Sequence, residues 1–187
     1  MGLFRGFISV DISEIGELVK LDRELQKVGG GMRPVSMDII HVTLKFLGET
    51  DEAAIPKIIE AMDKAVKGVP PFEIALKGMG SFPSPNNIRV VWVGMQGAEA
   101  LVGIAKVLDD ELARLGFEKE ERPFSPHLTV GRMKDPTGTE QVKGIIERFK
   151  DHDFGTRSVR SIRLKKSVLG SKGPTYTTVA EVVLQGL

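Results

Sequence analysis

The stretch His-Val-Thr-Leu at residues 41–44 is repeated as His-Leu-Thr-Val at residues 127–130, and these two stretches contain two of the chain's three histidines. Alternate residues of a strand point to the same face. Each histidine therefore shares a face with the threonine two positions later, while the apolar residues face the other way. Such a strand packs a core with one face and lines a cleft with the other. Two strands of this kind would place two imidazoles and two hydroxyls around one ligand.

The elements around the two stretches follow a similar order. Each His-x-Thr strand precedes a helix, a strand, a Gly-Ser loop with proline and a further strand, which predicts an α+β chain of two divergent repeats. The repeats are roughly residues 1–96 and 97–187. The predicted strands are 7–12, 38–48, 72–79, 88–95, 127–132, 159–169 and 176–184, and the predicted helices are 15–25, 55–66, 101–115 and 139–149.

The composition limits the classes of protein that the chain can represent. Its 187 residues are 41% hydrophobic and contain no linker-like stretch, which predicts one domain over residues 1–187. The absence of cysteine excludes disulfides, thiolate zinc sites and a cysteine nucleophile. A net charge of +1 indicates that any nucleic acid is held locally at an end. With no signal peptide and no membrane-spanning run, we expect a cytoplasmic protein without a membrane partner.

Two imidazoles and two hydroxyls suit chemistry at a phosphoryl centre. The ordinary pKa of histidine is about 6.5, so near neutral pH one imidazole can take a proton from water while the other protonates a leaving oxygen. Threonine hydroxyls can donate hydrogen bonds to phosphate oxygens, and a nearby cation can balance the developing charge. The nearest cations are Lys45, which has the strand parity of His41, and Arg132, which follows a glycine that can bend the strand.

The sequence also resembles the RNA 2',3'-cyclic phosphodiesterases of the two-histidine (2H) phosphoesterase superfamily, the LigT-like proteins historically called 2'-5' RNA ligases. The resemblance covers nearly the whole chain. Its most specific parts are HVTLKFLG at residues 41–48, GSFP at 80–83 with RVVWVG at 89–94, and PFSPHLTVGR at 123–132. Three such matches in the same order define the expected family.

The resemblance implies a bilobal α+β fold in which two antiparallel sheets with a pseudo-twofold relation line a central cleft, with helices outside. It also implies that a terminal 2',3'-cyclic phosphate of RNA is opened to a 2'-phosphate without metal or cofactor. His41 would be the proton donor and His127 the proton acceptor, and Thr43 and Thr129 would hold phosphate oxygens. Ligation of a cyclic phosphate end to a 5'-hydroxyl is a second implied activity. A tRNA half is one candidate substrate, and we expect a monomer.

Other residues are candidates for substrate contacts. Arg132 matches the arginine that follows the family's second motif, so we expect it to contact phosphate. Strand parity predicts that Phe46 packs in the core, whereas Phe124, between a proline and a serine, is freer to stack on a terminal base. Arg89 is a candidate cation at the edge of the cleft. The third histidine, His152, lies in a polar stretch and is predicted to be a surface residue.

Three alternatives stay open at this point. A metal-dependent hydrolase would use the two motif histidines with acidic residues, although the sequence has no His-Glu-x-x-His motif, and activity that survives a chelator would exclude it. A non-catalytic RNA-end or nucleotide-binding protein would bind without turnover. A phosphodiesterase of the same superfamily would act on 2'-5' oligonucleotides or small cyclic phosphates.

Overall fold

The computed structural model describes residues 2–12 and 15–186, and in these residues nine strands form two antiparallel sheets. Sheet A has the order β3 (His41–Asp51), β1 (Leu3–Asp11), β8 (Ser161–Gly170) and β9 (Gly173–Val183). Sheet B has the order β2 (Met32–Pro34), β6 (His127–Met133), β5 (Asn87–Gln96), β4 (Phe72–Ser84) and β7 (Asp153–Val159). The predicted α+β class with two antiparallel sheets is confirmed.

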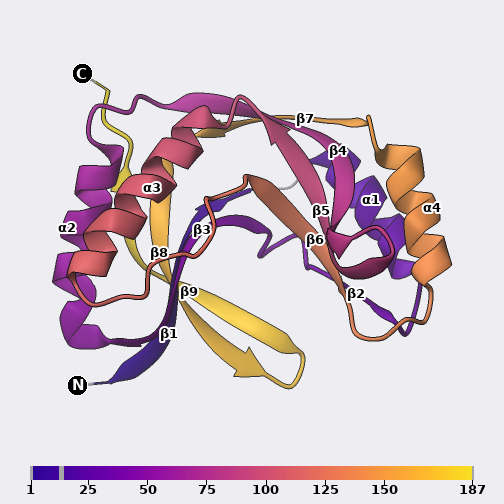
Figure 1. The fold of residues 1–187 in the computed structure, drawn as a ribbon, viewed down its shortest axis with the longest axis horizontal. Helices are drawn as coiled ribbons and strands as arrows, with labels where there is room; N and C mark the ends of the chain where they lie inside the picture. The colour runs from indigo at the N-terminus through magenta and orange to yellow at the C-terminus, as the bar shows by residue number, and fades with distance from the viewer. Residues whose placement is uncertain (1, 13–14, 187) are drawn as a thin grey trace.

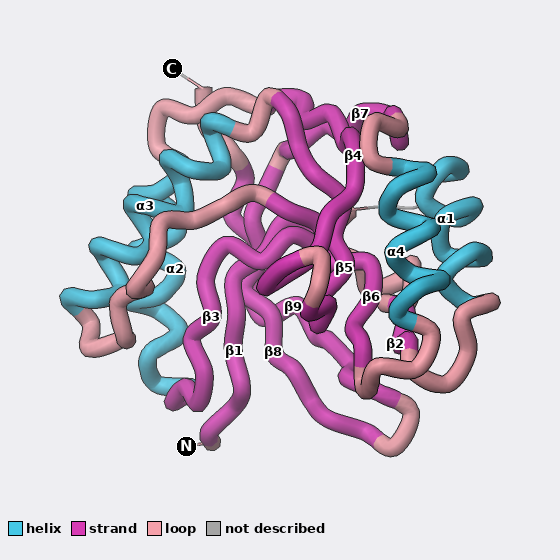
Figure 2. Tube along the Cα trace, turned by 45° about the vertical axis from the view of Figure 1, so that its right-hand side comes forward, coloured by secondary structure: helices cyan, strands magenta, loops and turns pink. Residues whose placement is uncertain are grey.

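The helices cover the outer side of each sheet, with the strands between them (Figures 1 and 2). Against sheet A pack α2 (Ile55–Val66) and α3 (Glu99–Arg114), which contact β9 and β3 respectively. Against sheet B pack α1 (Gly16–Gln26) and α4 (Thr139–Phe149), which contact β7 and β4 respectively. Their buried apolar residues recur at helical spacing, as Leu18, Leu21 and Leu25 do in α1. A short 3₁₀ helix, Glu52–Ala54, precedes α2. No helix in the described ranges is long and apolar enough to span a membrane.

The two halves of the chain are interleaved. The series β1-α1-β3-α2 is matched by β5-α3-β6-α4, but α1 leaves sheet A to pack on sheet B, and α3 leaves sheet B to pack on sheet A. Sheet A also takes its other two strands from the end of the chain. The lobes therefore do not correspond to residues 1–96 and 97–187, because each sheet contains strands from both ranges.

Several element boundaries differ from the sequence prediction. Strands β2 and β7 were not predicted, since β2 has three residues and β7 buries only Phe154 and Val159. Residues 80–87, predicted as a loop, mostly continue β4 and turn only at its tip. Gly80 pairs with Trp92 in this hairpin, and a Cβ at Gly80 would collide with the indole ring. The glycine is required by the ring that lies over it.

A β-bulge follows each His-x-Thr stretch. Ser9 pairs with Thr43 and Ile8 with Lys45, so Leu44 is the extra residue of β3. In β6 the extra residue is Val130, between the pairs that Thr129 and Gly131 form with β5. A bulge shifts the alternation of side chains by one residue. As a result, the third residue after each threonine lies on the face of the histidine.

Candidate active site

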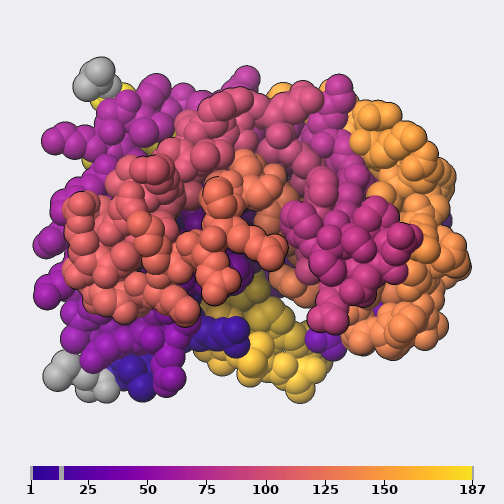
Figure 3. Space-filling view, in the orientation of Figure 1, coloured from indigo at the N-terminus to yellow at the C-terminus, as the bar shows by residue number. Residues whose placement is uncertain are grey.

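The two motif histidines occupy the same position in their strands. His41 begins β3 and His127 begins β6, and these two strands contact each other where the sheets meet. The space-filling view shows the surface hollowed between the yellow β8–β9 hairpin and the magenta and orange segments beside it (Figure 3). The fold therefore brings the two repeated stretches together at a cleft between the sheets.

Both imidazoles are oriented by a main-chain carbonyl two residues earlier. The Nδ1 atom of His41 lies 2.8 Å from the Ile39 oxygen, and that of His127 lies 2.8 Å from the Ser125 oxygen. A carbonyl oxygen only accepts, so Nδ1 carries the hydrogen in both rings. In both rings, Nε2 is therefore the nitrogen that can take up or give a further proton. In the described structure, Nε2 of His41 lies 3.1 Å from the Thr43 hydroxyl.

Aromatic rings contact both histidines. The His41 ring lies 4.9 Å from that of Phe7 and 5.2 Å from that of Tyr176, measured between ring centroids. The His127 ring lies edge-on to Phe82 at 5.1 Å. These contacts restrict ring rotation and fix where each Nε2 points. Phe7 faces the cleft because it is two residues from Ser9, the cross-strand partner of Thr43.

The pKa of His41 is below its ordinary value, chiefly because burial disfavours the charged ring. The Ile39 carbonyl and Asp11 oppose this shift, whereas the positive charges of Lys165 and Arg132 add to it. Lys165 belongs to sheet A and Arg132 to sheet B, so positive charges of both sheets act on His41. A lowered pKa makes the protonated ring a stronger acid.

Arg132 lies on the cleft face of sheet B. It comes after the bulge at Val130, pairs with Val90 and is exposed. A Cβ at Gly131 would come 2.8 Å from the sulfur of Met32, which is the far end of a flexible side chain. Thr129 pairs with Trp92 on the same face. The structure thus places Arg132 and Thr129 on the side of His127, as expected from the sequence.

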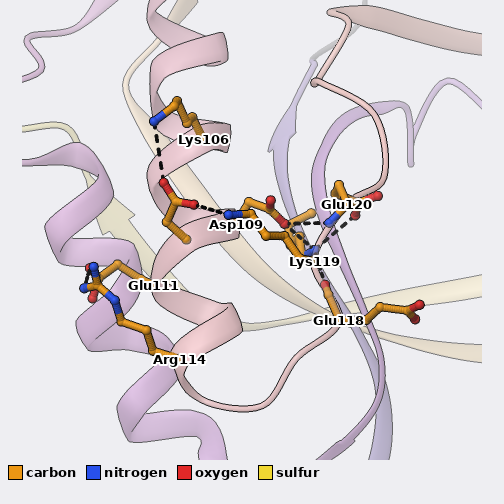
Figure 4. A network of polar contacts seen from close by, with 9 residues as sticks. Lys106, Asp109, Glu111, Arg114, Glu118, Lys119 and Glu120 are labelled. Carbon is orange, nitrogen blue, oxygen red and sulfur yellow. Dashed lines mark hydrogen bonds and ion pairs between the residues drawn. The ribbon is translucent and has the colours of Figure 1, made fainter.

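Lys45 does not lie in the cleft, which contradicts its assignment to phosphate. The bulge at Leu44 turns it toward α3, where its Nζ lies 2.7 Å from an Asp109 oxygen and 3.2 Å from a Glu120 oxygen. It also donates to the Glu118 carbonyl at 2.6 Å. Figure 4 shows Asp109 on α3 and Glu118 and Glu120 on the loop that follows it. The side chain is 1% exposed, so Lys45 has a structural role.

The two phenylalanines beside the motifs differ in burial from the sequence prediction. Phe46 is 64% exposed and pairs with Phe7 of β1, on the face that carries His41. Phe124 is partly buried and packs against the hydrophobic core. Parity counting failed for Phe46 for the same reason as for Lys45, because the count does not include the bulge. Arg89 is exposed at the β4–β5 hairpin, next to the cross-strand partner of Arg132.

An ion-pair network beside His41 was also missed by sequence reasoning. One Asp11 carboxylate oxygen accepts from Arg163 at 2.6 Å and from Lys165 at 2.7 Å, and Arg163 also contacts Glu181 at 3.2 Å. These residues come from β1, β8 and β9, which become neighbours only in the folded sheet. No single stretch of sequence carries this signal.

His152 is not the plain surface residue that the sequence predicted. Its Nε2 lies 2.9 Å from a Glu17 oxygen, and its ring packs against Phe149 and Phe154. It joins the α4 end to α1, outside the cleft. Within residues 2–12 and 15–186, no three side chains of the kinds that ligate metal gather at one place.

Comparison with known proteins gives the family. Residues 7–164 match the family model of the 2'-5' RNA ligase superfamily. A Methanocaldococcus jannaschii protein named RNA 2',3'-cyclic phosphodiesterase is 40% identical over 178 residues, covering 95% of this chain and 99% of that protein. An Archaeoglobus fulgidus protein of the same name is 37% identical over 174 residues, covering 92% and 96%. The chain belongs to the 2'-5' RNA ligase superfamily.

Solved structures have the same fold. TT0787 of Thermus thermophilus matches with a TM-score of 0.82 at 28% identity, over 97% of this chain and 98% of that chain. E. coli LigT in complex with 3'-AMP matches with a TM-score of 0.71 at 23% identity, over 98% and 99%. The LigT-like 2H phosphoesterase fold and the family expected from the resemblance are both confirmed.

Proposed function

We propose that this protein is an RNA 2',3'-cyclic phosphodiesterase that hydrolyses a terminal 2',3'-cyclic phosphate to a 2'-phosphate. The observation that carries the proposal is the matched pair of imidazoles, each held at Nδ1 by a carbonyl and each with Nε2 left for proton transfer. Membership of the 2'-5' RNA ligase superfamily supports it, as do the names of the relatives. The enzyme is accordingly a hydrolase.

In the proposed reaction, His127 takes a proton from water as the water oxygen attacks phosphorus. The bond between phosphorus and O3' breaks, and His41 gives its proton to O3', leaving a 3'-hydroxyl and a 2'-phosphate. Each positioned proton transfer contributes about 10² to 10⁴-fold. Solvent then removes the proton from His127 and restores the one on His41.

Three groups on the same faces are proposed to hold the phosphate. Thr43 and Thr129 donate hydrogen bonds to its non-bridging oxygens, and Arg132 balances the negative charge. The exposed Phe46 is the candidate for stacking on the terminal base, since any base offers a π face. Lys45 and Phe124 are not proposed to contact the substrate, because Lys45 is bound to Asp109 and Phe124 packs against the core.

The expected substrate is the end of an RNA, such as a tRNA half, held locally by a monomeric cytoplasmic enzyme that uses no metal or cofactor. The net charge of +1 supports local binding. Joining a cyclic phosphate end to a 5'-hydroxyl through a 2'-5' linkage is a proposed second activity, because the same two imidazoles can transfer protons between those oxygens.

Hydrolysis of a short RNA with a terminal cyclic phosphate, in excess EDTA, tests the function. We expect turnover that EDTA does not change, with a 2'-phosphate as the product when the 2' and 3' isomers are resolved. The same RNA ending in a 3'-phosphate is the control and should be untouched. Activity lost with EDTA and restored by a metal ion would support the metal-dependent alternative. Binding without turnover would support a recognition protein, and preference for 2'-5' oligonucleotides or small cyclic phosphates would change the substrate.

A further inference from the structure

A carboxylate lies beside the proposed proton donor. Asp11 pairs with His41 where β1 runs against β3, and paired residues share a face of the sheet. Its Oδ2 atom accepts from Arg163 at 2.6 Å and from Lys165 at 2.7 Å. The Ser9 hydroxyl donates to its Oδ1 atom at 3.4 Å. With both oxygens engaged, the carboxylate is held in one orientation on the face that carries His41.

Groups that can carry a charge lie on each strand around His41 and in the loop before β3. They are Asp11 on β1, Lys165 on β8, Tyr176 on β9, Arg132 and His127 on β6, and Asp38 in the loop. Asp38 is engaged locally, because it accepts from the Ser36 hydroxyl. Tyr176 is neutral near neutral pH, because burial raises the pKa of its hydroxyl. The charges of Asp11, Lys165 and Arg132 act on the imidazole.

Two of these charges conflict with the role of His41. A proton donor has to carry its proton before O3' departs. Burial lowers the pKa of His41, and the positive charges of Lys165 and Arg132 lower it further. Asp11 acts in the opposite direction. Burial raises the pKa of Asp11 itself, but hydrogen bonds from Lys165 and Arg163 outweigh this effect, so the carboxylate keeps its negative charge.

We propose that Asp11 is a positioning residue that enables His41 to carry the proton given to O3', by balancing the charges of Lys165 and Arg163 beside the imidazole. The inference rests on the proposed function, because it takes His41 as the donor. Such a balance lets Arg132 serve the phosphate in the same cleft in which the donor must itself be positive. The three balanced side chains line a pocket of about 450 Å³. Water in this pocket screens their charges, so we expect moderate effects.

The test is an NMR pH titration of the labelled His41 imidazole in Asp11→Asn and in Lys165→Gln. Loss of the negative charge disfavours the imidazolium, so the ring in Asp11→Asn should titrate at a lower pH than in the wild type. Loss of the positive charge favours the imidazolium, so the ring in Lys165→Gln should titrate at a higher pH. An ion pair with a purely structural role would not move the two titrations in opposite directions.

Glu181→Gln is the matched control. Glu181 belongs to the same network, because it accepts from Arg163 at 3.2 Å and from Ser161 at 2.6 Å. It lies on β9, however, and β8 separates β9 from β1 in the sheet. The variant loosens the network but leaves Asp11 and Lys165 in place beside the imidazole. Its His41 titration should therefore match that of the wild type.

The pH dependence of kcat gives a second measurement. At about pH 8.5, well above the ordinary histidine value of about 6.5, kcat follows the small fraction of His41 that is still protonated. Asp11→Asn is expected to lower kcat there by about 3- to 10-fold, and Lys165→Gln to raise it by about 2- to 5-fold. These differences should shrink as the pH falls, because the ring then becomes protonated in every variant.

If neither variant moves the His41 titration, the network is structural and the inference is overturned. A fall in kcat of Lys165→Gln at every pH would show that Lys165 binds the substrate, which also contradicts the inference. Where Asp11→Asn does not fold, the direction of the Lys165→Gln titration decides. If the titrations shift as expected but the wild type hydrolyses no cyclic phosphate, the proposed function fails and the effect of Asp11 on His41 stands.

Discussion

Replacing either His41 or His127 with alanine is expected to lower kcat by about 10² to 10⁴-fold, because each replacement removes one of the two proton transfers. The kcat of the double variant should be only a little below that of the slower single variant, because the effects of groups that act in one step are not additive. Steady-state kinetics with a cyclic-phosphate RNA end measures all three. KM should change much less than kcat, because Thr43, Thr129 and Arg132 remain to bind the phosphate.

His152→Ala is the control for these variants. That ring packs between α4 and α1, where its Nε2 contacts Glu17, and its loss is expected to leave kcat unchanged. A fall in kcat at His152 as large as at the motif histidines would indicate a general loss of structure. If the alanine variant of His41 or of His127 kept wild-type kcat while folded, the paired mechanism would be wrong for that residue.

Replacing Lys45 with alanine is expected to lower the free energy of unfolding by about 3 to 5 kcal/mol, the usual cost of removing one partner from a buried ion pair. The loss leaves Asp109 and the Glu118 carbonyl without their shared donor. Denaturant unfolding at neutral pH measures the change. The kcat of the folded variant should match the wild type, because Lys45 lies on the opposite face from His41.

The pH dependence of this loss provides a second check. Burial raises the pKa of Asp109, but hydrogen bonds from Lys45 and the Glu120 N–H outweigh it, and the net pKa lies below the ordinary 3.8. A lowered carboxyl pKa stabilises the fold above the unfolded value and loses that effect as the pH falls through the folded value. The difference in the free energy of unfolding between the wild type and Lys45→Ala should therefore become smaller below pH 3.8.

Lys106→Ala serves as the matched lysine control. Its side chain is 80% exposed, and its contact with Asp110, at 3.6 Å, is a surface pair. The expected change in the free energy of unfolding is within about 0.5 kcal/mol. Equal changes in the free energy of unfolding for Lys45→Ala and Lys106→Ala would contradict a buried ion pair at Lys45.

The sequence predicted the strands of both histidines well because their signal is local. Alternation of apolar and polar residues placed His41 and Thr43 on one face, and the glycine before Arg132 marked the bend there. The same counting failed at Lys45 and Phe46. A bulge is a mismatch between two paired strands, so the residues of β3 alone do not indicate whether Leu44 is the extra one.

The remaining parts of the site depend on which strands become neighbours. Phe7 and Tyr176 meet at the His41 ring from opposite ends of the chain, because β1 and the β8–β9 hairpin join one sheet. Tyr176 is the single tyrosine of the sequence, which was the one available hint. The exchange of α1 and α3 between the sheets likewise depends on packing between segments far apart, and a division of the chain into successive halves could not reveal it.

If His41 and His127 flank one phosphate, NMR titration of the labelled imidazoles should detect the same ligand at both rings. In the free protein, the His41 ring should titrate below 6.5, its ordinary value, because it is buried. Adding a nucleoside 2'-phosphate should shift the signals of both rings with one shared dissociation constant, while the His152 signals stay in place. A response from only one motif histidine, or two different dissociation constants, would contradict a shared site.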